Sequence, residues 1–345
     1  MSPITTMIII SSLATGTIIT STSYHWLMAW IGLELNTLSI LPIISKQHHP
    51  RATEAATKYF LTQSAASALI LFSSTVSAWK SGTWDITQMT NPTSNILLTS
   101  ALAMKLGLAP MHFWLPEVLQ GSTMKTALII STWQKLAPMA LMTITANNLS
   151  PTILIYMGTL STMIGGWGGL NQTQTRKIMA YSSIAHLGWM ATISTIMTNM
   201  MLMNLMLYIT MTTSMFFMLI LSKSKTIQDT TMSWTSSPTI TIMTMLTLLS
   251  LGGLPPLTGF LPKWLILEEL TLQSLTTMAT MMAMSSLLSL FFYLRIAYTT
   301  TLTTAPATTT TTHKWRFKPT LPTTLLSSTL PFTLWLLPMT PLILL

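Results

Sequence analysis

Long apolar runs alternate with short polar or Pro- and Gly-rich breaks along the whole chain. A helix that crosses the hydrocarbon core of a bilayer needs about 20 predominantly apolar residues, and the breaks divide the sequence into about eleven such segments. Ser and Thr are frequent in them, but their hydroxyls can bond to a backbone carbonyl one turn earlier and do not argue against insertion. The pattern predicts an all-α membrane protein with a single membrane domain, 1–345. The predicted spans are 3–21, 25–45, 53–78, 94–118, 125–145, 151–171, 177–196, 200–222, 238–270, 275–298 and 323–343.

The positive charges of the loops test this count, because Lys and Arg collect on one side of a membrane. They follow the even-numbered spans, and the opposite loops contain only Lys80. An error of one span would mix the two classes of loop, so the alternation supports an odd number of spans and an N-terminus on the positive side. The cations of that side are Lys46, Arg51, Lys58, Lys125, Arg176, Lys177, Lys223, Lys225, Arg295, Lys314, Arg316 and Lys318.

Composition excludes several other classes of protein. Charged residues make up 7% of the chain, against about 25% in a typical globular protein. The net charge of +9 comes from cations scattered singly through apolar sequence, a pattern that does not favour nucleic acid as a partner. The chain has no cysteine with which to form a disulfide, a thiolate zinc site or a cysteine-ligated iron–sulfur cluster. The first residues lack the features of a signal or transit peptide, so we expect a mature first helix.

Two of the predicted spans contain dense glycine and proline close to a lysine. The segment GLAPMHFWLP begins two residues after Lys105, and LGGLPPLTGFLP directly precedes Lys263. Such residues interrupt the helical hydrogen-bond ladder, and lipid cannot satisfy the freed backbone groups. We expect each segment to be a broken helix that faces protein or internal water. For either segment alone, a simple proline kink is the alternative.

These interrupted helices are the fourth and ninth predicted spans, which suggests a repeated unit of five helices. An odd repeat places its second copy upside down relative to the first, as in many transporters whose working site lies at broken helices. We therefore predict a first repeat over 1–148 and an inverted second repeat over 149–298. Residues 299–345 would add a polar loop and a terminal helix.

The ionisable side chains inside the predicted spans are Glu34, Lys105, Lys135 and Lys263. Each buried charge costs about 2.5–3.5 kcal/mol on insertion scales, so these groups must be paired, hydrated or functional. Snorkelling of a lysine to the interface is the alternative. However, Glu34, Lys105 and Lys135 lie about 15 Å from the start of their helices, close to mid-bilayer. We predict that the four groups belong to the working site.

His112 and His186 also lie in or near apolar spans. A neutral imidazole both donates and accepts, so either residue could relay a proton, although a histidine that only packs is the commoner case. His48 and His49 are expected to face solvent in a loop.

The remaining acidic residues attract weaker hypotheses. The pair Glu268 and Glu269 could coordinate a cation, but such a pair more often marks the exit of a helix into water. Asp85 and Asp229 are expected in loops. Stripes of Met and Trp are expected to face lipid or to pack between helices rather than to surround a cofactor.

Three segments together resemble one protein family closely. They are MKLGLAPMHFWLPEV at 104–118, KIMAYSSIAHLGWM at 177–190 and LLSLGGLPPLTGFLPKW at 248–264. The family is that of the antiporter-like membrane subunits of respiratory NADH:ubiquinone oxidoreductase, and the resemblance covers essentially the whole chain. GLELN at 32–36, the eleven-span length and the Met- and Thr-rich composition resemble the members encoded in animal mitochondrial DNA. Like those members, the chain lacks three N-terminal helices of the family's usual fourteen-helix plan.

The resemblance implies a role for each buried charge. Glu34 and Lys105 would form the family's carboxylate–lysine couple, Lys135 would be the central lysine, and Lys263 would be the terminal lysine on the second broken helix. It also implies no cofactor in this chain, with NADH, FMN, iron–sulfur clusters and ubiquinone held by other subunits. The expected partners are the other membrane-arm subunits of the complex and the lipid bilayer of the mitochondrial inner membrane, with the N-terminus on the matrix side.

Buried titratable groups suggest a mechanism in which redox chemistry on other subunits drives proton transfer. Protons would step among Glu34, Lys105, Lys135 and Lys263 along internal water, because the distance of a lysine from a carboxylate alters how firmly it holds its proton. One alternative is an independent cation/proton antiporter with the same fold. Another is a purely structural subunit whose buried pairs fix helix register. Composition does not separate the three, and the resemblance favours the first.

Overall fold

The structure is a computed structural model that describes residues 2–235, 237–302 and 323–340. Within these ranges the chain is built from helices, and β pairing is confined to the single-residue bridges His25–Asp85 and Gln174–Thr226. The predicted all-α class is confirmed. Most of the predicted polar loop, with Lys314, Arg316 and Lys318, and the end of the predicted last span lie outside the described residues.

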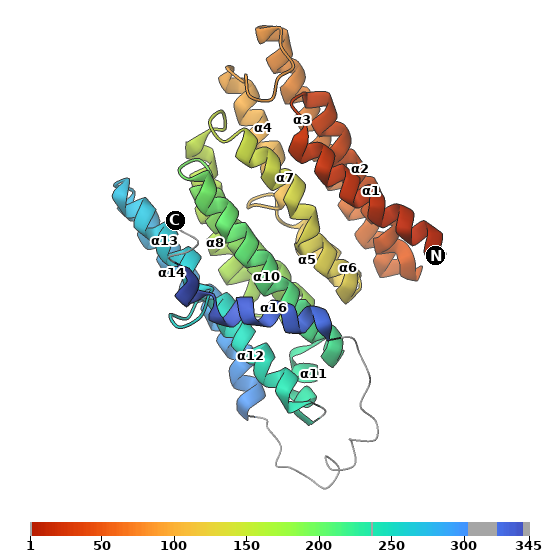
Figure 1. The fold of residues 1–345 in the computed structure, drawn as a ribbon, viewed down its shortest axis with the longest axis vertical. Helices are drawn as coiled ribbons and strands as arrows, with labels where there is room; N and C mark the ends of the chain where they lie inside the picture. Colours follow the sequence, from red (N-terminus) through yellow and green to blue (C-terminus); the bar gives the residue numbers. More distant parts are fainter. Residues whose placement is uncertain (1, 236, 303–322, 341–345) are drawn as a thin grey trace. The chain divides into compact units, whose positions relative to one another are not determined.

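The described residues form two compact units. Unit 1 comprises the chain up to Ser161 together with Leu187–Met201, and unit 2 comprises Thr162–His186 together with the residues from Leu202 onwards. Unit 1 contains the helices α1 (Pro3–Thr22), α2 (Trp26–Ile44), α3 (Pro50–Ser81), α4 (Pro92–Leu106), α5 (Trp114–Gly121), α6 (Met124–Ser131) and α7 (Trp133–Ile144), which Figure 1 labels. The helices α8 (Pro151–Gly169), α9 (Thr175–Ile193) and α10 (Thr198–Ser222) contribute residues to both units.

Unit 2 continues with a short helix that the hydrophobic pattern did not predict. This is α11 (Ile227–Met232), which connects α10 to α12. The other helices of unit 2 are α12 (Pro238–Gly252), α13 (Phe260–Leu272), α14 (Thr276–Leu302) and α16 (Thr324–Trp335).

Several helices are suited to a bilayer by length and composition. Six helical segments in the described part of the chain are long and apolar enough to cross a membrane unaided. They are Pro3–Thr22, Trp26–Ile44, Pro50–Ser81, Met124–Ile144, Thr198–Ser222 and Thr276–Leu302. The chain is therefore an all-α membrane protein. The count of eleven spans, the inverted repeat and its boundaries stay predictions.

Local sequence explains where the helices begin and why their polar residues are tolerated. Proline occupies the first turn of α1, α3, α4 and α12, where its missing N–H and fixed φ do no harm. Within the helices, hydroxyls donate to carbonyls one turn earlier, as Ser73 does to Ile70 at 2.8 Å and Thr247 does to Thr244 at 3.0 Å. These bonds satisfy the side chain without a partner outside its own helix.

Small residues let α1 and α2 approach closely in unit 1, where the two helices lie side by side (Figure 1). A Cβ atom added to Gly16 would lie 2.9 Å from the Gly32 carbonyl oxygen, and one added to Gly32 would lie 2.6 Å from a methyl of Thr20. Small residues at a contact let helices pack closely in lipid. Such packing drives helix association there, because lipid is as apolar as the helix surfaces and supplies no hydrophobic driving force.

The two predicted interruptions are present. α4 ends at Leu106, followed by Gly107 at φ +82°, and α5 begins only at Trp114. α12 ends at Gly252, followed by Gly253 at φ +77°, and α13 begins only at Phe260. Positive φ values at both helix ends explain why glycine follows each half-helix.

A third interruption lies inside the predicted span 125–145. α6 ends at Ser131 and α7 begins at Trp133, so the predicted span is helical on both sides of a one-residue break at Thr132. This segment contains Pro138, which cannot donate to the Gln134 carbonyl, but it has no glycine. The sequence signal for the break was therefore weak.

Candidate functional site

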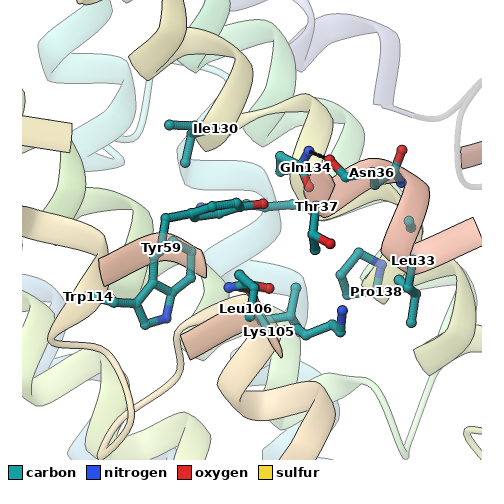
Figure 2. Close-up of a pocket in the computed structure, with 13 residues that line it drawn as sticks. Leu33, Asn36, Thr37, Tyr59, Lys105, Leu106, Trp114, Ile130, Gln134 and Pro138 are labelled. Atoms are coloured by element: carbon teal, nitrogen blue, oxygen red, sulfur yellow. Dashed lines mark hydrogen bonds between the residues drawn. The ribbon is translucent and has the colours of Figure 1, made fainter. Parts of the chain in front are cut away.

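A small cavity lies inside unit 1, where α2, α3, α4, α5, α6 and α7 converge. Its walls include two of the predicted site residues, Lys105 from α4 and Lys135 from α7, together with the polar side chains of Thr37, Tyr59 and Gln63. Figure 2 labels Lys105, Thr37 and Tyr59 among them. Its volume is about 10 Å³, which is close to the minimum that one water molecule needs. The structure therefore brings two lysines from different helices to one water-sized space.

Lys105 lies in the last turn of α4 and is 5% exposed. Its Nζ atom has no hydrogen-bond acceptor among the described residues. The unwound chain that follows is held by side chains: Trp114 Nε1 donates to the Met104 carbonyl at 3.2 Å, and Gln63 Nε2 donates to the Lys105 carbonyl at 3.5 Å. The freed carbonyls of this broken helix thus bond within the protein, as the sequence led us to expect.

Glu34 lies on α2 and is half-buried. The Thr37 hydroxyl donates to its Oε2 atom at 3.1 Å, and the carboxylate interacts electrostatically with Lys105 and Tyr59. Glu34 and Lys105 do not form an ion pair within 4.0 Å. The two ion pairs found among the described residues both involve Lys58. The two groups therefore act on each other across a gap rather than in direct contact.

Lys135 lies in the first turn of α7 and is 3% exposed. The residue before it, Gln134, lines the cavity and donates through Nε2 to the backbone carbonyl of Asn36 at 3.1 Å, as the dashed line in Figure 2 shows. Neither the amide oxygen nor the amide nitrogen of the buried Asn36 side chain has a partner among the described residues. A Cβ atom added to Gly16 would lie 2.6 Å from the Asn36 amide oxygen, so this amide faces α1.

Lys263 lies in unit 2, on α13, and is 9% exposed. Its Nζ donates to the Gly252 carbonyl at 2.7 Å, at the end of α12. A cation at the C-terminus of a helix is stabilised by the unpaired carbonyls there. The break itself is tied to α16, because the Thr258 hydroxyl donates to the Thr333 carbonyl at 2.6 Å. Lys263 therefore lies beside the break between α12 and α13.

The two candidate relay histidines have different surroundings. His112 lies in the interrupted segment of unit 1, is 4% exposed, and directs Nδ1 at the Pro110 carbonyl, 3.3 Å away. His186 lies on α9, is 6% exposed, and its ring centroid is 5.5 Å from that of Tyr208. Both rings are buried, which suits packing as well as proton relay, so their role stays a prediction.

Lys58, near the start of α3, forms ion pairs with two carboxylates. Its Nζ lies 2.5 Å from Glu54 Oε1 on the same helix and 2.6 Å from Glu117 Oε2 on α5. The three side chains are between 41% and 60% exposed. This cluster links α3 to α5 at the surface of unit 1.

The remaining candidates lie outside the cavities. His48 and His49 are exposed between α2 and α3. Glu268 is exposed and Glu269 half-buried on α13, and the described residues contain no group of three or more His, Cys, Asp or Glu that could hold a metal ion. Asp85 lies in the connection between α3 and α4.

The expectation that Asp229 lies in a loop is wrong. It belongs to α11, where its carboxylate accepts from the backbone N–H groups of Lys225 and Thr226 at 2.9 Å each, and the Thr226 hydroxyl completes a capping box. The two backbone donors hold the pKa of Asp229 below its ordinary value of 3.8. A Thr followed three residues later by Asp was the available sequence signal.

Five polar residues of the unit 1 cavity were missed by sequence reasoning: Asn36, Thr37, Tyr59, Gln63 and Gln134. Each lies within a predicted span, where a polar side chain needs a partner inside the protein. Asn36 and Gln134 also stand close in sequence to predicted site residues, Glu34 and Lys135. Uncharged polar residues inside apolar runs could therefore have been singled out alongside the charges.

Two family profiles match the chain. One is described as "NADH:quinone oxidoreductase/Mrp antiporter, TM" and matches residues 23–289. The other is described as "NADH dehydrogenase subunit 2 C-terminus" and matches residues 290–344. Together they account for most of the sequence.

Curated relatives match over nearly the full length. "NADH-ubiquinone oxidoreductase chain 2" of Varanus timorensis is 59% identical over 342 residues, which is 99% of each chain. The protein of the same name from Salmo salar is 58% identical over 341 residues, covering 99% of this chain and 98% of its own.

Solved structures share the fold. A chain of respiratory complex I from Thermus thermophilus with bound aureothin matches with a TM-score of 0.84 and 24% identity, over 97% of this chain and 78% of its own. A chain of the Mrp complex from Dietzia sp. DQ12-45-1b matches with a TM-score of 0.74 and 15% identity, over 84% of this chain and 59% of its own.

Proposed function

Because the chain belongs to the NADH:quinone oxidoreductase/Mrp antiporter family and matches its chain 2 members end to end, we propose that it is the corresponding membrane subunit of a respiratory NADH:ubiquinone oxidoreductase. In this assignment it lies in the mitochondrial inner membrane beside other membrane-arm subunits, with its N-terminus on the matrix side. NADH, FMN, the iron–sulfur clusters and ubiquinone belong to other subunits. This chain contributes to the movement of protons across the membrane.

The observation that carries the proposal is the cavity shared by Lys105 and Lys135. An ammonium group removed from water needs acceptors or an opposite charge, yet Lys105 Nζ has no acceptor among the described residues. One water molecule in the cavity would accept from Lys105 and could donate to the hydroxyl oxygen of Thr37, which lines the cavity. Such a water would connect the lysines, because proton transfer needs hydrogen-bond reach or one bridging water.

Glu34 supplies the means of control in this mechanism. Its charge acts on Lys105 across a gap, so a change in that gap, or in the water that screens it, alters how firmly Lys105 holds its proton. Redox chemistry on other subunits would drive this change. Thr37, which bonds to the Glu34 carboxylate and lines the cavity, would transmit a movement of Glu34 to the cavity wall.

Lys263 would act in a second step in unit 2. Its amine donates to a helix-terminal carbonyl, and release from that carbonyl would free it to exchange a proton with internal water. His112 and His186 are candidate relays. Protons would thus step among Glu34, Lys105, Lys135 and Lys263.

The test is proton translocation by the assembled complex carrying Lys105→Met or Lys263→Met. Methionine keeps much of the volume of lysine and removes the titrating amine. Lys80→Met is the matched control, because Lys80 is exposed at the end of α3. We expect assembly to persist in all three variants and translocation, measured by dye quenching in proteoliposomes, to fall in the two buried ones. Unaltered translocation in both would remove these lysines from the mechanism.

Two alternatives have specific support. The fold shared with an Mrp complex favours an independent cation/proton antiporter, which should transport cations when the chain is reconstituted alone in liposomes. The Lys263–Gly252 bond favours a structural role, because it caps a half-helix. Under that reading Lys263→Gln, which can still donate to the carbonyl, would preserve proton translocation, whereas a proton carrier would lose it.

A further inference from the structure

Two tyrosines are fully buried in unit 2: Tyr208 on α10 is 0% exposed and Tyr293 on α14 is 1% exposed. A hydroxyl removed from water needs a hydrogen-bond partner, and buried tyrosines usually have one. The Tyr293 hydroxyl has none within hydrogen-bond distance among the described residues. The adjacent Phe292 is buried equally deeply without such a group. Packing alone therefore does not explain the hydroxyl of Tyr293.

Hydroxyl groups from two other helices lie near that of Tyr293. The side chain of Ser182 on α9 lies beside it, outside the geometry of a hydrogen bond, and donates its own hydrogen to the Met179 carbonyl at 2.8 Å. The Tyr208 hydroxyl bonds to Ser183, the next residue of α9, and interacts electrostatically with Tyr293. Each hydroxyl oxygen both donates and accepts, so the hydroxyl cluster of Ser182, Ser183, Tyr208 and Tyr293 can pass a hydrogen from one oxygen to the next.

The hydroxyl cluster reaches His186 on one side. His186 follows Ser182 by four residues on α9, so the two side chains lie on the same face of that helix. Its ring centroid is 5.5 Å from that of Tyr208. An imidazole can give a proton to a neighbouring group or take one from it. The candidate relay His186 and the hydroxyl cluster therefore form one buried polar group.

The ring of Tyr293 reaches the second helix break on the other side. A Cβ atom added to Gly252 would lie 3.6 Å from the Cδ2 atom of Tyr293, at ordinary van der Waals distance. The Gly252 carbonyl is the acceptor of the Lys263 amine. Tyr293 thus lies between the helix end that holds Lys263 and the hydroxyl cluster that ends at His186.

We propose that Tyr293 carries protons between His186 and Lys263, with Tyr208 as the step between Tyr293 and His186. This inference rests on the proposed function, because it needs Lys263 to exchange protons. A proton that reaches the Tyr293 oxygen forms a new O–H bond, while the O–H bond that the oxygen already had breaks and its hydrogen leaves on the other side as a proton. The tyrosine is neutral before and after, and the proton ends on the unprotonated amine of Lys263. A step longer than a direct hydrogen bond takes one bridging water.

The test is proton translocation per NADH oxidised in the assembled complex carrying Tyr293→Phe. Phenylalanine keeps the ring against Gly252 and removes only the hydroxyl. Tyr298→Phe is the matched control, because Tyr298 lies on the same helix and is 65% exposed. We expect Tyr293→Phe to lose translocation to the same extent as Lys263→Met, and Tyr298→Phe to keep it. Tyr208→Phe should show the loss as well, which provides a second variant where one fails to assemble.

Two further measurements separate a proton carrier from a structural side chain. Thermal inactivation of the complex should be unchanged or slower in Tyr293→Phe, because burial of a hydroxyl without a partner destabilises the fold. The double variant Tyr293→Phe with Lys263→Met should lose no more translocation than either single variant, since the effects of two groups in one pathway are not additive.

Three outcomes would overturn the proposal: full translocation in the assembled Tyr293→Phe complex, faster thermal inactivation that accompanies the loss, or a double variant that loses more than either single one. Failure of the proposed function gives a different result. If Lys263→Met lowers translocation and Tyr293→Phe does not, only the tyrosine relay is wrong. Unaltered translocation in Lys263→Met would instead remove Lys263 from the proposed function, and the relay with it.

Discussion

Replacing Gly253 with alanine tests the link between the second helix break and Lys263. Gly253 has φ +77°, and a Cβ atom there would lie 2.9 Å from Lys263 Nζ. The left-handed backbone costs a non-glycine residue about 1–2 kcal/mol. The amine must also leave the Gly252 carbonyl, and the loss of a hydrogen bond to a charged group costs about 1.5–3 kcal/mol. The combined loss of stability is about 2.5–5 kcal/mol. The hydrogen-bond part alone lowers the occupancy of the amine at the Gly252 carbonyl by at least about tenfold.

Gly82→Ala is the matched control for backbone strain. Gly82 ends α3 at φ +73°, and a Cβ atom there meets nothing within 4 Å, so its replacement costs only the strain of about 1–2 kcal/mol. Thermal inactivation of the assembled complex and its proton translocation in proteoliposomes measure the difference. We expect Gly253→Ala to lose more thermal stability than Gly82→Ala and to lose translocation, while Gly82→Ala keeps it. Equal behaviour of the two variants in both assays would refute the link.

Three further predictions concern the supporting structure. Gly32→Val should force α1 and α2 apart, since a Cβ atom at Gly32 already lies 2.6 Å from Thr20; overpacking of about 1–3 kcal/mol should lower the melting temperature, and an unchanged value would contradict the close approach. The lowered pKa of Asp229 means that its carboxylate stabilises α11 above pH 3.8 and that this contribution is lost as pH falls through the lowered pKa. Asp229→Asn should therefore speed hydrogen exchange of the Lys225 amide at neutral pH, and an unaltered rate would exclude the cap. Lys58→Gln should leave thermal stability nearly unchanged, because exposed ion pairs contribute little; a large drop in melting temperature would show that the cluster is shielded in the complex.

Hydrophobic patterning predicted the helices well because each feature it uses is local. Proline in the first turn marks the starts of α1, α3, α4 and α12, and glycine with proline marks the breaks after Leu106 and Gly252. The break at Thr132 was not predicted, because no glycine lies beside it in the sequence. The helix α11 was not predicted, because six residues are too few to show an amphipathic pattern.

The site was predicted in its charges but not in its surroundings. A lysine in an apolar run is conspicuous, so Lys105, Lys135 and Lys263 could be named from sequence alone. That Lys105 and Lys135 share a cavity depends on which faces of six helices converge, and such long-range packing leaves no local trace. For the same reason the sequence did not show that Gln63 and Gln134, which lie on different helices, line the cavity.

The central claim is that buried lysines around the unit 1 cavity exchange protons. It is tested most directly by the rate of proton translocation in the complex carrying Lys135→Met, with Lys80→Met measured beside it. Lys135 is 3% exposed and lines the cavity, so its replacement leaves the solvent-exposed surface of the chain nearly unchanged. We predict a marked loss of translocation in Lys135→Met and the unmodified rate in Lys80→Met. Translocation at the unmodified rate in a fully assembled Lys135→Met complex would contradict the claim.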